Sequence, residues 1–334
     1  MEHLKISVVI PCLNEEKHIE TCIRSILDNG YPQELLEVIV IDGVSSDNTL
    51  LILKKMQSEF GQIEVLVNSK KITPVSLNMG LNHATSPYVL IASAHSSFDA
   101  NYIQVLKDAL ENTEDAIGVG GPMKTLVKNE TATSCAIQEI LQHRFGVGNS
   151  KFRTGSSEKV AVDTVPFGLY KTQSLLDVGG YNEKLVRNHD MELSKRLSQK
   201  GGQIYLIPET SCNYFARESY AQMTSNNYKN GKWNMLTVFI TRRFSSLSLR
   251  HFIPMFFILS LIIPSFLSLF FCPFIYLTMV SFLMYLLGII YFSLTIKSNK
   301  TSFLYLFIGF MSLHFSYGIG SLIGLFNIPF TQRS

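Results

Sequence analysis

Four side chains in the first 200 residues have the chemistry of a binding site that also holds a proton acceptor. Asn14 and Glu15 follow one short apolar run, Asp42 follows the next, and Asp190 follows an Arg-Asn-His triplet. Carboxylate and amide oxygens accept hydrogen bonds from the N–H and O–H groups of a ligand. A carboxylate within hydrogen-bond reach of an attacking hydroxyl also removes its proton. These residue types therefore indicate a site for a polar ligand with a candidate general base.

The first three of these residues lie where predicted strands end. Runs rich in β-branched and aromatic residues predict four strands, at 6–10, 37–41, 63–67 and 88–92. Helical spacing of apolar residues lies between them, with Asp47 or Asn48 and then Thr73-Pro74 as start signals. This β-α-β-α-β-α-β order predicts a parallel sheet with right-handed crossovers. Such sheets bind ligands at the carboxyl ends of their strands, so we expect a nucleotide to lie along that edge.

The rest of the globular part is less regular. It contains a strand-like run at 117–120, a charged helix predicted over 190–200 and a strand predicted over 203–207. Asp99 is expected to cap the helix that bears Tyr102 rather than to bind a ligand. We therefore predict an α/β domain over residues 1–235.

Composition and charge exclude several classes of protein. The chain has 334 residues, of which 46% are hydrophobic and 16% charged, which is too apolar for an ordinary soluble protein. Of its 29 Lys and Arg only Lys297, Lys300 and Arg333 lie beyond residue 251, and none of its 26 Asp and Glu lies beyond Glu218. Residues 1–251 are therefore neutral overall. No excess positive charge remains there to neutralise phosphates, so we expect no nucleic-acid partner.

The carboxyl-terminal part has the composition of membrane-spanning helices. No formally charged side chain occurs from Phe252 to Ile296 or from Thr301 to Gln332. Because a spanning helix needs about 20 apolar residues and proline interrupts helical hydrogen bonding, Cys272-Pro273 divides the first stretch. The predicted spans, listed in order, are 253–271, 274–296 and 303–326, within a region 252–330 that follows a basic juxtamembrane segment at 236–251.

Basic residues predict the orientation of these spans. Lys and Arg precede the first predicted span and also lie between the second and the third, which places both segments on the cytoplasmic side. The amino-terminal domain is then cytoplasmic, and Arg333 lies outside. The first apolar run is followed at once by Pro11 and charged residues, so we expect no signal sequence. Five cysteines without a Cys-x-x-Cys pair indicate reduced thiols rather than disulfides or a zinc site.

Several segments, taken together and in order, resemble family 2 glycosyltransferases of the GT-A fold. They are ISVVIPCLNEE, VIVIDGVSSDNT, SLNMGLNHATSPYVLIASAH, GLYKTQSLLDVGGYNEKLVRNHDMEL and NNYKNGKW. FGVGNSKFR and VDTVPFG are similar to the subset that acts in succinoglycan biosynthesis. The likeness covers roughly residues 5–235. It implies a Rossmann-like nucleotide-sugar-binding domain and inverting transfer of a hexose from a nucleoside diphosphate.

The resemblance assigns donor-binding roles to a defined set of residues. Those expected to bind the nucleotide-sugar are Pro11, Asn14, Glu15, Asp42, Lys71, Asn78, Ser93 and His95. The residue that matches Asp42 binds the base in the family. A turn carboxylate that caps residues 43–48 is the alternative role for Asp42.

The resemblance also implies where the acceptor reacts. Asp190 matches the family's general base, although His189 replaces an acidic residue there. Asp190 can equally start the helix that follows it, and a helix start would hold a base rigidly. His189 and Trp233 are expected on the acceptor side. The indole of Trp233, the only tryptophan, can form the floor of a sugar site or anchor the chain at a membrane interface.

A divalent cation is the cofactor that the resemblance raises. Most relatives hold it with an Asp-x-Asp motif, for which this chain has Ser93-Ala94-His95. Magnesium prefers oxygen ligands and manganese accepts imidazole more readily. We therefore expect weakened binding of manganese or magnesium, with selectivity moved towards manganese and His95 as the candidate ligand. A His95 that is hydrogen-bonded in its loop without metal is the alternative. Lys70, Lys71 or Arg187 can supply part of the missing positive charge.

The sequence thus predicts a multi-pass enzyme of a bacterial cell (inner) membrane. We expect it to move one sugar from a UDP-sugar to a lipid-linked oligosaccharide during surface polysaccharide biosynthesis. The Gln/Arg-x-x-Arg-Trp pattern of processive synthases is absent, and three spans are few for a secretion channel. Two alternatives stay open: a polyprenyl-phosphate sugar transferase, and a catalytically weak scaffold subunit that binds nucleotide-sugar.

Overall fold

The structure is a computed structural model that describes residues 5–331. The chain divides into two compact units. The first unit comprises Met1–Lys124 and Lys151–Phe215, and the second comprises Thr125–Ser150 and Ala216–Ser334. Residues 125–150 and 216–235, which the sequence placed in one domain with the strands, therefore pack with the carboxyl-terminal helices. Arg333, predicted to lie outside the membrane, falls beyond the described residues.

An eight-stranded sheet forms the centre of the first unit. Its strands are β1 (Ile6–Cys12), β2 (Leu36–Asp42), β3 (Ile63–Val67), β4 (Tyr88–Ile91), β6 (Ala116–Gly120), β8 (Val160–Val162), β9 (Leu169–Lys171) and β10 (Gln203–Leu206). Their order is β3-β2-β1-β4-β9-β6-β10-β8. The first four strands are parallel, as the sequence predicted, whereas β9 is antiparallel to both β4 and β6.

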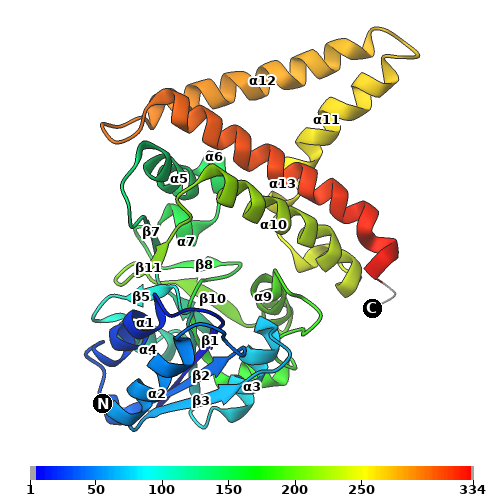
Figure 1. Ribbon diagram of the computed structural model, residues 1–334. Helices are drawn as coiled ribbons and strands as arrows, with labels where there is room; N and C mark the ends of the chain where they lie inside the picture. The colour runs from blue at the N-terminus through cyan, green and yellow to red at the C-terminus, as the bar shows by residue number, and fades with distance from the viewer. Residues whose placement is uncertain (1–4, 332–334) are drawn as a thin grey trace. The chain divides into compact units, whose positions relative to one another are not determined.

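Helices cover both faces of this sheet (Figure 1). Alternate strand residues point to opposite faces, so Val8 belongs to one buried cluster and Val9 to the other. The helices of the first cluster are α1 (Ile19–Leu27), α2 (Thr49–Glu59) and α4 (Tyr102–Glu111). Those of the second are α3 (Thr73–His83), α8 (Thr172–Asp177) and α9 (His189–Gln199). A strand buried on both faces explains the nearly continuous apolar runs in the sequence.

A glycine allows α3 to lie close against the sheet. A Cβ added to Gly80 would come within 2.4 Å of Cγ1 of Val9, closer than real carbon atoms approach. Thr73 is the first residue of α3 rather than its cap, with Pro74 in the first turn. A proline is tolerated there because its missing N–H has no partner in a first turn.

A smaller sheet of three strands has the order β5-β11-β7. The strands are β5 (Ser96–Phe98), β7 (Met123–Leu126) and β11 (Cys212–Phe215). β5 and β11 pair antiparallel, with Tyr214 opposite Ser96. Because β5 follows directly after His95, this sheet continues from the loop that ends β4.

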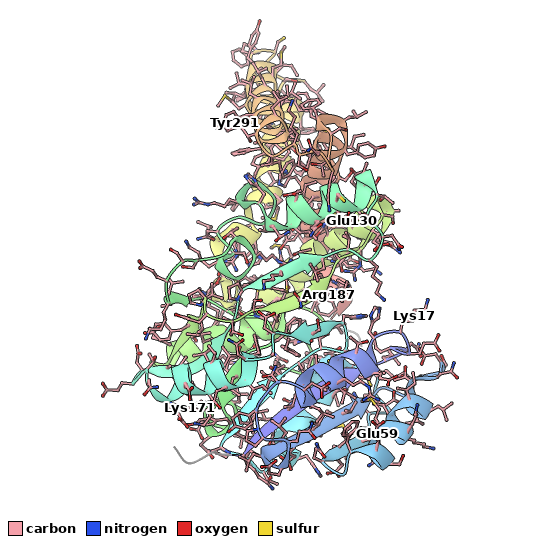
Figure 2. All side chains as sticks on the ribbon, turned by 90° about the vertical axis from the view of Figure 1, so that its left-hand side faces the viewer. Lys17, Glu59, Glu130, Lys171, Arg187 and Tyr291 are labelled. Carbon is pink, nitrogen blue, oxygen red and sulfur yellow. The ribbon has the colours of Figure 1, made fainter. Side chains whose placement is uncertain are left out.

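The second unit is helical. Its helices are α5 (Ala132–Gln142), α6 (Arg144–Val147), α10 (Tyr220–Thr241), α11 (Ile253–Leu267), α12 (Phe274–Thr295) and α13 (Phe303–Thr331). By length and composition, α12 and α13 could cross a membrane. The side chain of Tyr291 on α12 projects outward and is 62% exposed (Figure 2). The first predicted span, 253–271, contains a helix of only 15 residues. At 1.5 Å per residue it is shorter than the roughly 30 Å of a bilayer core.

Candidate active site

Asp42 stands at the carboxyl end of β2, directly beside the end of β1. The parallel register pairs Cys12 with Asp42. The carboxylate is buried and accepts hydrogen bonds from the N–H of Ser45, at 3.0 Å, and from its hydroxyl, at 2.5 Å. Asp42 therefore holds the turn that follows β2, which is the structural role that the sequence allowed for it. The predicted contact of Asp42 with the nucleotide base stays a prediction.

The loops after β1 and β2 are joined by hydrogen bonds between their side chains and backbones. Asn14 has a left-handed backbone, with φ of 57°, and its Oδ1 accepts from the N–H of Ser46 at 2.8 Å. The N–H of Asn14 donates to Ser45 Oγ at 2.8 Å, and the N–H of Glu15 donates to Thr49 Oγ1 at 2.7 Å. Pro11 lies within β1. The structure thus brings Pro11, Asn14 and Glu15 to the same sheet edge as Asp42.

The loop after β4 meets the loop after β1 through His95, whose ring also lies edge to face with that of His18, with centroids 5.2 Å apart. His95 Nε2 lies 2.7 Å from Glu15 Oε1. The side chain of His95 is 47% exposed, whereas that of Glu15 is 13% exposed. Ser93 offers its carbonyl oxygen to the hydroxyl of Ser96 at 2.6 Å. His95 is therefore hydrogen-bonded in its loop, and it remains accessible from outside.

The residues around His95 do not make a preformed cation site. Glu15 and His95 supply one oxygen and one nitrogen donor, and these two atoms contact each other. Within residues 5–331, no group of three or more His, Cys, Asp or Glu side chains is placed to hold a metal ion. Magnesium and manganese take about six ligands, mostly oxygens. The predicted role of His95 as a metal ligand therefore lacks a supporting donor set in the described residues.

Asp190 occupies the first turn of α9, as the sequence allowed. Asn188 precedes the helix in a left-handed conformation, with φ of 62°. Asp190 is exposed. Burial raises the pKa of Tyr170, and the nearby Asp190 carboxylate raises it further. Tyr170 lies on β9, which pairs with β4, so the carboxylate stands over the same sheet as the loop that follows β4.

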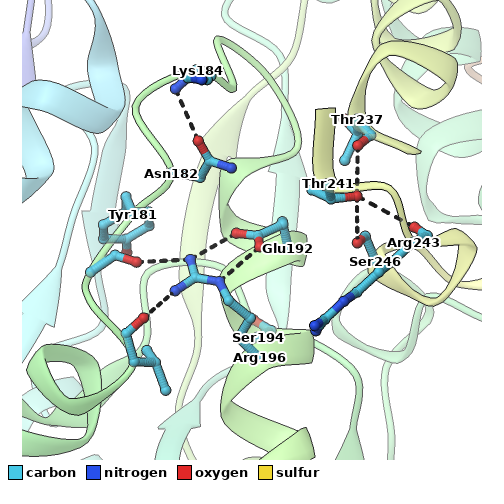
Figure 3. A network of polar contacts seen from close by, with 12 residues as sticks. Tyr181, Asn182, Lys184, Glu192, Ser194, Arg196, Thr237, Thr241, Arg243 and Ser246 are labelled. Carbon is cyan, nitrogen blue, oxygen red and sulfur yellow. Dashed lines mark hydrogen bonds and ion pairs between the residues drawn. The ribbon is translucent and has the colours of Figure 1, made fainter. Parts of the chain in front are cut away.

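An arginine that the sequence analysis did not single out fixes α9 in position. Arg196 donates to the carbonyl oxygens of Val178 at 2.6 Å and Gly180 at 2.8 Å. It also forms two bonds of 2.7 Å with the buried carboxylate of Glu192 (Figure 3). The four-residue spacing of Glu192 and Arg196 was visible in the sequence, but the two carbonyl partners were not. This network ties the helix of Asp190 to the segment that follows α8.

His189 lies beside Asp190 with part of its ring unsatisfied. Its Nδ1 is buried and has no hydrogen-bond partner in the described chain. Burial lowers the pKa of His189, and the charge of Asp190 offsets only part of this effect. The ring also meets Tyr181 edge to face, with centroids 5.8 Å apart. A neutral imidazole with an unused nitrogen is therefore next to the candidate base.

Two other residues predicted to bind the donor are Asn78, in α3, and Lys71, just before α3. Asn78 donates to the carbonyl of Tyr181 at 2.9 Å and accepts from its N–H at 2.7 Å. Its amide therefore holds the segment that leads to Asp190. Lys71 is exposed and has a left-handed backbone, while Lys70 lies 3.6 Å from Glu183. Arg187, labelled in Figure 2, stands in that segment as well.

Trp233, predicted on the acceptor side, belongs to the second unit. Its motif lies in α10, whose Asn234 donates to Tyr317 Oη at 2.9 Å. A Cβ on Gly231 would come within 2.0 Å of the Tyr317 carbonyl oxygen, so α10 and α13 are in close contact. The motif NNYKNGKW thus contributes to packing inside the second unit. Trp233 itself is half-buried, and its predicted sugar contact stays a prediction.

The parallel strands β1 to β4 and the helix that carries Asp190 lie where the sequence patterns predicted them. Residues 7–171 match the family model described as Glycosyl transferase family 2. These residues form a family 2 glycosyltransferase domain. The family and the enzyme class that the motifs predicted are confirmed.

Two curated relatives each resemble this glycosyltransferase over somewhat less than two thirds of its chain. The first, from Methanococcus voltae, is a dolichyl N-acetyl-alpha-D-glucosaminyl phosphate 3-beta-D-2,3-diacetamido-2,3-dideoxy-beta-D-glucuronosyltransferase. It is 27% identical over 221 residues, which are 64% of this chain and 68% of the relative. The second, succinoglycan biosynthesis protein ExoA of Rhizobium meliloti, is 31% identical over 213 residues, 63% of each chain. The likeness therefore spans about two thirds of both relatives.

Solved structures share the GT-A fold. The mannosyltransferase PcManGT of Pyrobaculum calidifontis, in complex with GDP-Man and Mn²⁺, has a TM-score of 0.60 and 13% identity. That match covers 98% of this chain and 88% of the other. TarS 1–349 of S. aureus, in complex with UDP-GlcNAc, has a TM-score of 0.51 and 18% identity and covers 75% and 73%. These matches confirm the predicted fold class, with carboxyl-terminal helices after the α/β domain.

Proposed function

We propose that this protein is an inverting transferase that moves a single sugar from a UDP-sugar to a lipid-linked saccharide. Asp190 carries the proposal, because it is a carboxylate at a rigid helix start above the sheet that bears the donor loops. The names of the relatives support the rest. One acts on a dolichyl-linked sugar phosphate, and the other belongs to succinoglycan biosynthesis. We therefore place the reaction in surface polysaccharide or glycan assembly.

The donor is bound at the carboxyl ends of β1, β2 and β4. Asp42 and Asn14 present oxygen acceptors toward the N–H and O–H groups of a nucleoside. Their hydrogen bonds with the loop after β2 fix these oxygens before the donor arrives. Binding then costs little ordering of the loops, which is the benefit of a preorganised site. UDP is the donor nucleotide of one structural neighbour, and GDP that of another.

Transfer takes place in one displacement. The hydroxyl of the acceptor attacks the anomeric carbon, and the bond to the diphosphate breaks on the opposite face. Asp190 accepts the proton of that hydroxyl, which is worth about a hundred- to ten-thousand-fold in rate. The unsatisfied Nδ1 of His189 lies beside it and accepts or donates a hydrogen bond to a hydroxyl of the acceptor sugar.

The leaving diphosphate needs positive charge near it. Two structural neighbours hold Mn²⁺, which supports a divalent cation in this fold. When bound, such an ion neutralises charge on the diphosphate oxygens. In this chain the two donors Glu15 and His95 are too few to build that site alone, and no step above depends on it.

The second unit holds the enzyme at a membrane. We place α12 and α13 across a bacterial cell membrane and the catalytic domain on its cytoplasmic side. Lys300, in the loop between these helices, pairs with Glu130 of the segment before α5, at 2.7 Å. That loop is therefore on the side of the membrane where the polar segments of the second unit lie. A lipid-linked acceptor held in the same bilayer would be presented at the domain.

Product analysis tests this function. The full chain in detergent is incubated with UDP-, GDP- and dTDP-sugars and with polyprenyl phosphate or a polyprenyl-linked saccharide. We expect release of UDP only when the saccharide acceptor is present, and a product with inverted anomeric configuration by nuclear magnetic resonance. Transfer to plain polyprenyl phosphate would contradict the acceptor. Tight UDP binding with no turnover for any acceptor would contradict the activity.

A further inference from the structure

Arg153 is a half-buried cation, with one buried nitrogen, to which the reaction described above gives no role. It lies in the short helix α7 (Lys151–Thr154), at the end of the segment FGVGNSKFR. The guanidinium carbon stands 5.5 Å from the ring centre of Phe152 and 5.8 Å from that of Tyr214. Its Nη1 is buried and has no hydrogen-bond partner among residues 5–331. Two aromatic rings thus contact the cation, but no acceptor reaches that nitrogen.

The surroundings of Arg153 contain no opposite charge. Burial lowers the pKa of Arg153, and the groups that act against this effect are Tyr214 and Cys212, neither of them a carboxylate. Arg196, by comparison, donates to a carboxylate and to two carbonyl oxygens. An unpaired charge that is partly buried costs free energy, although less than the several kcal/mol of a fully buried one. An anion that comes from outside the chain would remove that cost.

The position of Arg153 connects it with the end of β4. Tyr214, under the guanidinium, is paired with Ser96 across β5 and β11. The hydroxyl of Ser96 donates to the carbonyl of Ser93, at 2.6 Å. Arg153 therefore contacts a residue whose strand partner, Ser96, directly follows the segment Ser93-Ala94-His95. This segment lies at the carboxyl end of β4, where the donor is proposed to bind.

We propose that Arg153 binds the diphosphate of the nucleotide-sugar and supplies positive charge to it as it leaves. The inference rests on the proposed function and assigns a further residue to its donor site. A guanidinium offers two parallel N–H donors, which match two phosphate oxygens. No bond to Nη1 has to break when the side chain turns toward a ligand. The positive charge that His95 does not provide then comes from the chain itself.

Binding and stability together test this role. Wild type, Arg153→Met and Arg153→Lys are compared as full chains in detergent with EDTA, by calorimetry with uridine and with UDP. Arg153→Met is expected to bind UDP about ten- to a hundred-fold more weakly, as for a lost hydrogen bond to a charged group, and uridine equally well. Arg153→Lys is expected to fall between the two. Without ligand, Arg153→Met is expected to melt no lower than wild type, because the buried charge is gone.

Each contrary outcome has a distinct meaning. Equal UDP affinity in wild type and Arg153→Met overturns the role of Arg153 and leaves the proposed function intact. A wild-type protein that binds neither UDP nor any UDP-sugar refutes the proposed function instead. A melting temperature for Arg153→Met several degrees below wild type shows that Arg153 serves packing, and this also overturns the inference. If Arg153→Met binds polyprenyl phosphate more weakly but UDP equally well, the donor is not the ligand of Arg153. Arg24→Gln, at an exposed arginine paired with Glu20 and Glu59, is the control.

Discussion

Two regions of the first unit differ in how their polar groups are satisfied. In the loops after β1 and β2, Asn14, Asp42 and Asp47 all accept hydrogen bonds from neighbouring residues. Around the candidate base, Nδ1 of His189 has no partner, and the same is true of Nη1 of Arg153 in the described chain. Polar atoms buried without partners cost free energy, and a bound ligand is one way to satisfy them, although Ser86 Oγ of the first unit is also buried without a partner in the described chain. The loops after β1 and β2 therefore have their hydrogen bonds before a ligand binds. His189 and Arg153 each have a buried nitrogen that a ligand could satisfy.

The largest effect is expected at Asp190, the carboxylate of the incomplete region. Asp190→Asn keeps the size of the side chain but removes the proton acceptor. We expect kcat to fall by about a hundred- to ten-thousand-fold. The KM for the UDP-sugar should change little, since Asp190 acts on the acceptor. Asp28→Asn, at an exposed carboxylate that ends α1, is the matched control and should keep full activity. Unchanged turnover in Asp190→Asn would reject Asp190 as the base.

The next effect concerns stability and compares the two half-buried arginines. Arg196→Met removes four hydrogen bonds and leaves the carboxylate of Glu192 buried without its partner. Breaking one side of such a pair costs about 3–5 kcal/mol. Chemical denaturation should therefore show a large loss for Arg196→Met and none for Arg153→Met. The double variant Glu192→Leu with Arg196→Met should recover part of the loss, because no charge is then left unpaired. Equal losses for both arginines would show that the different partners of Arg196 and Arg153 do not decide their effect on stability.

The sequence predicted the parts of this structure that depend on local patterns. Strands β1 to β4 were found because β-branched runs alternate with helical spacing, and α9 because the run from Asp190 to Lys200 is rich in charged residues. The bonds between Asn14 and Ser46 join residues 32 positions apart, and no periodic pattern encodes them. The contact of the Arg153 guanidinium with the Tyr214 ring joins residues that lie farther still apart along the chain.

The sequence patterns also did not predict how the chain divides into two units. Residues 125–150 pack with the carboxyl-terminal helices because Phe145 and its neighbours contact α12 and α13. Such contacts require knowing which helices meet. The predicted span 253–271 had sufficient apolar length, but the helix stops at Leu267 and a turn follows. Hydropathy alone does not report where a helix ends.

A smaller effect separates the two roles of Asp42. Asp42→Asn removes one acceptor of the turn bonds from Ser45, and Asp47→Asn removes one of the bonds from Thr49. Asp42→Asn should cost about 1–3 kcal/mol of stability, as for a lost bond to a charged group, and Asp47→Asn should cost less because Asp47 is less buried. If Asp42 also binds the uracil base of the donor, UDP affinity should fall further in Asp42→Asn than in Asp47→Asn. Equal affinity in the two variants would show that Asp42 holds the turn and does not bind UDP.

The smallest effect is the pH dependence that His189 adds to stability. Burial lowers the pKa of His189 below the 6.5 of an unfolded chain. The unfolded state then binds more protons in the window below 6.5, so stability rises with pH there. The contribution is complete above pH 6.5 and is lost as pH falls through the lowered pKa. His189→Gln should therefore lose less stability than wild type between pH 7 and pH 5, measured by denaturation at each pH. An acceptor sugar bound to Nδ1 should stabilise the neutral form of His189 and make the stability of the wild type depend more steeply on pH. The stability of His189→Gln should show no such response to the acceptor sugar. This difference would show that the acceptor binds the unsatisfied nitrogen.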